Sequence, residues 1–144
     1  MKKIIVSAIA VVVIVGAVVA YLQWNKSEVN VKDSKGLIIT SVDLYNDYSK
    51  DSVGSKAKYL EKILQVKGEV HSISKNQQNQ TIVQIKTSVD GAFVNCTFEK
   101  VNENVSVKAG DLVELKGICE GIGEGDKDMG IMGDVYLVRC YLMQ

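Results

Sequence analysis

Several residue types that mark common functional classes are scarce in this chain of 144 residues. It has no proline, one histidine and three cysteines. The absence of proline excludes collagen-like sequences and proline-rich linkers. With one histidine and no Cys-x-x-Cys pair, the sequence supports neither a zinc site nor an iron–sulfur cluster. We therefore expect no metal and no cofactor.

Neither sign of charge dominates the chain. Lys and Arg number 17, as do Asp and Glu, so the formal net charge is zero. This balance excludes a strongly basic nucleic-acid-binding arm and an extended acidic tail. The length corresponds to one domain, or to one small domain with an appendage.

One long uncharged run, Ile4–Leu22, follows Lys2 and Lys3 at the N-terminus. As a helix it would be about 28 Å long, which matches the roughly 30 Å hydrocarbon core of a bilayer. Tyr21 and Trp24 lie at its far end, where aromatic rings favour the membrane interface. We expect residues 1–24 to form a signal-anchor transmembrane helix, with the lysines in the cytoplasm and the rest of the chain outside it.

Three alternatives explain this run less well. A cleaved signal peptide needs a shorter apolar stretch and an Ala-x-Ala-like site, which Val18-Val19-Ala20 matches poorly. A lipoprotein needs a cysteine directly after the run, whereas the first cysteine is Cys96. A buried core helix would need more surrounding protein than the remaining residues supply. Whether the anchor is cleaved stays open.

The rest of the chain divides into a polar linker, residues 25–38, and a folded domain, residues 39–144. Cys96, Cys119 and Cys140 all lie in the domain, and an odd number leaves at least one unpaired. Their positions in apolar strands favour small buried side chains over metal ligands, although their redox state stays open.

Two short helices are predicted at the start of the domain. The first follows Thr40 or Ser41, either of which can cap it, and Asp43 suits its positive first turn. Its apolar face combines Val42, Leu44, Tyr45 and Tyr48. The second is expected over about residues 55–61, after a break at Val53-Gly54, and would bury Ala57, Tyr59 and Leu60.

From Ile63 onward the apolar period changes to two, which predicts strands. Gly68, in the middle of the first strand, predicts a bulge or bend. Asp90-Gly91 predicts a type I′ hairpin turn, and Glu120–Asp134 a long loop. The five predicted strands are residues 63–70, 81–87, 92–98, 112–119 and 135–142. Five strands in this order predict a mainly β domain, a Greek-key barrel of the OB-fold type.

Residues 40–142 also resemble the tRNA-anti-like OB-fold family of bacterial exported proteins. The resemblance is carried by the following motifs: Leu44 and Tyr48; Ala57-x-Tyr59-x-x-Lys62-Ile63-Leu64-x-Val66-x-Gly68-x-Val70; Val94-x-Cys96-x-Phe98; Gly110-Asp111-x-Val113; Lys116-Gly117-x-Cys119; and Asp134-Val135-x-Leu137-x-x-Cys140. It implies an OB-fold barrel and a location at the bacterial cell membrane, outside the cytoplasm. It implies no activity, because a fold does not specify a function.

An OB-fold binds ligands on its second and third strands and on the flanking loops. Residues 56–87 carry six lysines against two glutamates, and Phe93 is the one aromatic platform on the outward face of the third strand. Residues 120–134, beside the same groove, carry five acids against one lysine, which disfavours phosphate. The candidate ligand-binding residues are Lys67, Lys86, Phe93, Asn95, Arg139 and Tyr141.

Other motifs carry less weight. Asp126-x-Asp128-x-Gly130 is a fragment of a calcium loop without the remaining ligands, and a solvated acidic loop explains it better. His71 is the only histidine and lies on a polar strand face. No cysteine or serine has a sequence context that marks it as a nucleophile, so we predict no enzyme. Three Asn-x-Ser/Thr sequons are interpreted as chance matches, because the family that the chain resembles is bacterial.

These observations predict a membrane-anchored binding or interaction module that faces outward. Its expected ligand is another envelope protein, a glycan or a cationic small molecule. The alternative is an OB-fold that binds single-stranded nucleic acid, which the acidic loop and the location outside the cytoplasm disfavour. The ligand and the oligomeric state stay open.

Overall fold

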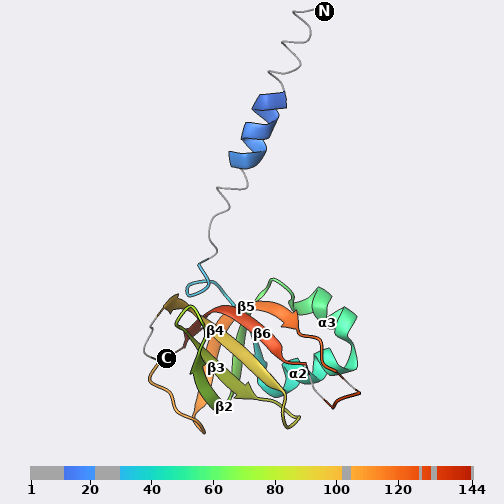
Figure 1. Cartoon of the computed structure of the whole chain (residues 1–144), viewed down its shortest axis with the longest axis vertical. Coiled ribbons are helices and arrows are strands. Elements are labelled where there is room, and N and C mark those ends of the chain that lie inside the picture. Colours follow the sequence, from blue (N-terminus) through green and yellow to red (C-terminus); the bar gives the residue numbers. More distant parts are fainter. Residues whose placement is uncertain (1–11, 22–29, 102–104, 127, 131–132, 144) are drawn as a thin grey trace, which may run out of the picture.

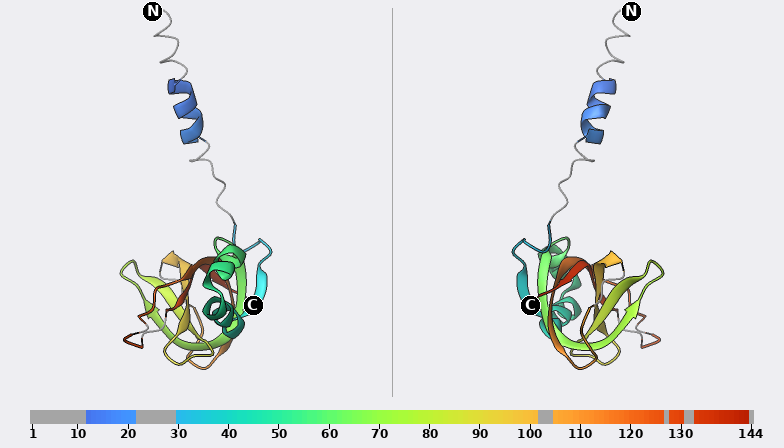
Figure 2. Two further views of the ribbon diagram at one scale, coloured as in Figure 1. Left: turned by 90° about the vertical axis from the view of Figure 1, so that its right-hand side faces the viewer. Right: turned by 90° about the vertical axis from the view of Figure 1, so that its left-hand side faces the viewer.

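The computed structural model describes residues 12–21, 30–101, 105–126, 128–130 and 133–143. Eight elements follow one another: β1 (Leu37–Thr40), α2 (Ser41–Lys50), α3 (Ser52–Tyr59), β2 (Ile63–Lys75), β3 (Gln80–Lys86), β4 (Phe93–Val101), β5 (Leu112–Ile122) and β6 (Val135–Leu142). The strands curl into a barrel, and α2 and α3 lie together against one side of it (Figures 1 and 2).

The barrel closes in the order β2-β3-β4-β6-β5, with β5 pairing back onto β2. Strands β4 and β6 are parallel, whereas the other four pairs in the ring are antiparallel. This is a closed five-stranded barrel with the predicted Greek-key order, and it confirms the mainly β class. The long strand β2 makes the closure possible, because Ile63–Glu69 pair with β5 and Val70–Lys75 pair with β3.

The alternating residues of these strands fill the barrel. The buried cluster includes Leu64, Val66 and Val70 of β2, as the period of two predicts. It also includes buried residues of the other four barrel strands: Val83, Ile85, Val94, Cys96, Phe98, Leu115, Cys119, Leu137 and Cys140. All three cysteines are buried and free.

The helices close one side of the core with tyrosines. Tyr45, Tyr48 and Tyr59 are almost fully buried, and the hydroxyl of Tyr59 donates to Asp47 Oδ2 at 2.5 Å. This hydrogen bond, followed by that from the Lys58 ammonium, lowers the pKa of the Asp47 carboxyl. The two helices are therefore joined through Asp47 of α2 and the last two residues of α3, as well as through the core.

The helix boundaries differ in part from the prediction. Thr40 caps α2 by accepting from the N–H of Asp43, as expected, but Val42 is exposed. Helix α3 begins at Ser52, with Asp51 as its cap, so Val53-Gly54 does not break it. Its shifted register buries Ser55 and Tyr59, and it leaves Ala57 and Leu60 exposed.

The folded part begins earlier than predicted, within the expected linker of residues 25–38. Strand β1 pairs in parallel with β2, and Val31 is only 1% exposed. The Lys116 ammonium, itself buried, donates to the carbonyls of Lys32 and Ser34 at 3.0 and 2.9 Å. These bonds fasten residues 32–34 to β5, whereas residues 25–29 lie outside the described part.

Three turn predictions also change. The loop after β5 starts at Gly123, because residues 120–122 continue the strand. Near Asp90 only Gly91 has a positive φ, which does not fit a type I′ turn. Of the bulge or bend predicted at Gly68, the bulge lies further along, between Val70 and Ser72, while pairing with β5 stays regular through Gly68.

Gly68 is needed for space. A Cβ there would overlap with the side chains of Ile85 and Ser41, the first residue of α2. The Ser41 hydroxyl lies this close because it donates to the carbonyl of Lys86 at 2.6 Å. The missing side chain therefore lets α2 seat on the barrel.

Residues 12–21 are helical, and all ten are exposed. Within the part of the chain that the structure describes, no helix combines the length and apolar character needed to cross a membrane. Most of the predicted anchor, residues 1–11 and 22–24, lies outside the described residues, so the anchor stays a prediction. The core cluster lies entirely within residues 44–140, so a fragment of residues 25–144 retains all of it.

Gly68→Ala tests the seating of α2. Because the new methyl group overfills the contact with Ser41 and Ile85, we expect the free energy of unfolding to fall by about 1–3 kcal/mol. Urea denaturation of the 25–144 fragment measures it. Lys67→Ala, a neighbour with an outward side chain, is the control and should change stability by less than about 1 kcal/mol. Equal midpoints for the two variants would contradict this packing.

Lys116→Met tests the attachment of residues 32–34. The variant keeps a side chain of similar length but leaves two carbonyls without their donor, so we expect a loss of about 1–3 kcal/mol. Amide hydrogen exchange should show faster exchange in β1, which follows this segment. Lys108→Met, an exposed lysine, is the control. Unchanged exchange in β1 would mean that the ammonium does not hold the segment.

Candidate functional site

A line of polar side chains crosses the outer face of β2, β3 and β4. The Ser72 hydroxyl donates to Gln84 Oε1 at 2.6 Å, and Gln84 Nε2 donates to Asn95 Oδ1 at 3.0 Å. Asn95 Nδ2 then donates to Asp134 Oδ2 at 2.8 Å, and the Phe93 N–H donates to Asp134 Oδ1 at the same distance. We call these four side chains, Ser72, Gln84, Asn95 and Asp134, the polar ladder.

The ladder changes the role of Asn95. Its amide oxygen and one amide N–H are used within the protein, and the residue is only 8% exposed. The side chain fixes the end of the β5–β6 loop, through Asp134, to the start of β4. Asn95 therefore has a structural role within the protein, and its contact with a ligand stays a prediction.

Phe93 lies at the edge of this face and is stacked against His71. Their ring centroids are 4.4 Å apart, with 22° between the planes. The two rings line a cavity of about 400 Å³, together with Lys86 and the β3–β4 turn at residues 87–92. Phe93 is half-buried, so the predicted aromatic platform is present, but the imidazole of His71 is stacked against it.

Each of the three predicted cationic residues lies against a glutamate. Lys86 Nζ is 2.5 Å from Glu69 Oε1, Lys67 Nζ is 3.2 Å from Glu114 Oε2, and Arg139 Nε donates to Glu99 Oε1 at 2.9 Å. The two lysine side chains are about half exposed, so these pairs contribute little to stability. They do neutralise the charge that a phosphate would meet.

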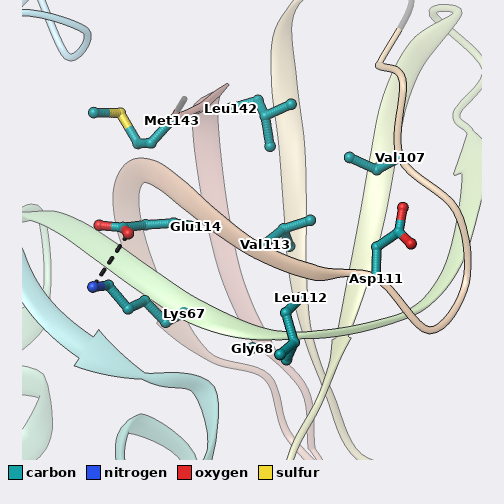
Figure 3. Close-up of a pocket in the computed structure, with 9 residues that line it drawn as sticks. All are labelled: Lys67, Gly68, Val107, Asp111, Leu112, Val113, Glu114, Leu142 and Met143. Atoms are coloured by element: carbon teal, nitrogen blue, oxygen red, sulfur yellow. Dashed lines mark ion pairs between the residues drawn. The ribbon is translucent and has the colours of Figure 1, made fainter.

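The six predicted residues do not form one site. Lys86, Phe93 and Asn95 share the β3–β4 face, where Lys86 and Phe93 are direct cross-strand partners. Lys67 lies with Glu114 on β2 and β5 (Figure 3), and Tyr141 is paired with Lys116 on β5. Arg139 lies on β6 and joins this strand to β4 through Glu99.

The sequence did not single out His71, or the ladder residues Ser72, Gln84 and Asp134, as parts of this face. The alternation of β3 was a usable signal for Gln84, because a polar residue between Val83 and Ile85 must point outward. No local pattern marks Asp134, since its partners are 39 and 41 residues away. Gly133 lets the two ends of the β5–β6 loop come close together, because a Cβ there would overlap with the backbone of Gly123.

Among the described residues, two buried thiols are held in their protonated form. Burial raises the pKa of the Cys119 thiol and of the Cys140 thiol, so both stay protonated at neutral pH. The hydroxyl of Tyr48 is 3.4 Å from Cys119 Sγ. Over the described residues, no three His, Cys, Asp or Glu side chains are grouped to hold a metal ion. Asp126 Oδ1 instead accepts the N–H groups of Asp128 and Met129.

Two comparisons with known proteins gave different results. No curated protein matches the chain. The family model tRNA_anti-like matches residues 1–131. This range includes helices α2 and α3 and strands β1 to β5, and therefore also Lys67 and Lys86. By this match and by its closed five-stranded barrel, the chain belongs to the tRNA_anti-like family of OB-fold proteins.

Proposed function

We propose that this protein is a membrane-anchored OB-fold module that binds another molecule of the cell envelope outside the cytoplasm. The favoured ligands are an envelope protein, a glycan or a cationic small molecule. The observation that carries this proposal is the pairing of Lys86 with Glu69 and of Arg139 with Glu99. A face built in this way has shape and hydrogen-bonding groups but little attraction for phosphate.

Electrostatics argue against nucleic acid as the main ligand. Proteins that bind single strands use a positive groove together with stacked aromatic side chains. Here Asp134 adds a carboxylate to the middle of the face, and exposed Glu120, Glu124 and Asp126 lie on the adjoining strand end and loop. The residues around the groove therefore favour neutral or cationic ligands.

The chemistry of the described residues favours binding over catalysis. His71 is exposed and stacked on Phe93, and its imidazole makes no hydrogen bond to an acid or a thiol within the described ranges. The raised pKa values of the Cys119 and Cys140 thiols oppose a nucleophilic role, because the thiolate is the reactive form.

The location is supported by the sequence. The run Ile4–Leu22 has the length of a membrane-spanning helix, and Lys2 and Lys3 precede it. In this arrangement the barrel follows directly on the outer side. The bonds of Lys116 to residues 32 and 34 would then hold the barrel close to the end of its tether.

One observation favours a second candidate, a single-strand nucleic-acid binder. The stacked rings of Phe93 and His71 lie beside Lys86 on the face that OB-folds use for bases. Base stacking on such rings contributes about 1–3 kcal/mol per base. This candidate requires that stacking outweigh the paired cations.

Fluorescence anisotropy with labelled single-stranded RNA and DNA separates the two candidates. For the 25–144 fragment at about 0.15 M salt, we expect a Kd weaker than about 100 µM, at the weak limit of non-specific binding. Replacing Glu69 and Glu99 by Gln together should create salt-sensitive binding by freeing the two cations. Asp43→Asn and Glu61→Gln, at exposed positions that do not line the cavity beside Phe93, form the matched control with the same change in charge. Tight binding by the unaltered fragment at this salt would overturn the proposal.

A fusion of alkaline phosphatase after Gln144 tests the location. Because this reporter is active only outside the cytoplasm, we expect activity from the full-length chain in bacterial cells. Removal of residues 1–24 should abolish that activity while the fusion protein is still made. An inactive full-length fusion, together with a fluorescent cytoplasmic reporter at the same position, would contradict the predicted orientation.

A further inference from the structure

A second and larger cavity lies away from the polar ladder, beside the start of β5. Its volume is about 630 Å³, within the range of roughly 300–1,000 Å³ typical of small-ligand sites. Figure 3 shows it between the segment that carries Val107, the first residues of β5 and the C-terminal end of β6. It belongs neither to the β3–β4 face nor to the proposal made for that face.

The walls of this cavity are mostly apolar. Val107, Val113 and Leu142 pack against the core with one side and line the cavity with the other. Leu112 is 84% exposed at the rim, and Met143 completes the wall. An exposed leucine alone means little, but five apolar side chains around one hollow form a surface that an aliphatic chain can cover.

The charged groups of the cavity are unbalanced. The Lys67 ammonium is already 3.2 Å from Glu114 Oε2, the ion pair marked in Figure 3. A second carboxylate, Asp111, lines the other side and accepts the Lys108 N–H through Oδ2 at 2.8 Å. Two carboxylates against one ammonium leave the lining negative, so a cation is the complementary charge.

We propose that this cavity binds a small amphiphile that has an aliphatic chain and a cationic head, an alkylammonium. The chain lies along Val107, Val113 and Leu142, and the head lies near the Asp111 carboxylate. The apolar contacts supply most of the affinity, and the carboxylates select the sign of the head group. The site is independent of the β3–β4 face, so either proposal stands if the other fails.

The test uses n-octylammonium and octanoate, which share the chain length and differ in the sign of the charge. Both are titrated into the 25–144 fragment at pH 7 and followed by amide chemical shifts. We expect octylammonium to bind with a Kd of about 1 mM, as expected for so small a ligand. It should bind about two- to fivefold more tightly than octanoate, with shifts at Val113 and Leu142.

Three variants locate the site. Asp111→Asn keeps an acceptor for the Lys108 N–H and should remove the preference for octylammonium. Leu112→Ser should weaken both ligands by about tenfold, because apolar area at the rim is lost. Ile38→Ser is the control, because it makes the same kind of change at an exposed aliphatic side chain outside the cavity; Ile38 lies on β1 and is 62% exposed. It should leave the affinity for both ligands unchanged.

Several results would overturn the proposal. One is equal affinity for octylammonium and octanoate, because the carboxylates would then select nothing. Others are chemical shifts confined to the β3–β4 face, or an absence of shifts at Val113 and Leu142 at saturating octylammonium. A preference that survives Asp111→Asn would also contradict it.

Discussion

The double pairing of β2 is the constraint on which the rest of the structure depends. One strand of 13 residues pairs with β5 over its first half and with β3 over its second, and this closes the ring. Gly68 lies just before the change of partner. Its missing side chain makes room for Ser41, so the start of α2 is placed by the same strand that closes the barrel.

Closure also determines what the outer faces can do. Once β3 and β4 are side by side, Gln84 and Asn95 become direct partners, and the β5–β6 loop is held to them through Asp134. Closure likewise brings Glu69 of β2 to Lys86 of β3. The face that an OB-fold offers to nucleic acids is thus satisfied and neutralised by its own residues. The cavity beside the start of β5, by contrast, keeps apolar walls and more carboxylates than ammonium groups.

Much of the fold was predictable because its signals are local. Alternating apolar residues predicted the five barrel strands, and the last of them, Val135–Leu142, agrees at both ends. Thr40 was one of two expected caps, and the structure selects it because Ser41 is turned toward β3. The errors also have local causes. Strand β1 is only four residues long, too short for its period to show, and the segment before it is held by Lys116, which is 84 and 82 positions from Lys32 and Ser34.

The candidate site was predictable only as a list of residue types. The sequence alone determined the barrel strands, their inward faces, the family resemblance and the apolar N-terminal run, because each depends on neighbouring residues or on spacing along one element. Only the tertiary structure decided which acid neutralises which cation, since Lys86 and Arg139 are 17 and 40 residues from their glutamates. It also decided that Asn95 is a structural residue and that Phe93 stacks on His71. Those contacts arise between strands, and the register between strands is determined by the closed ring as a whole.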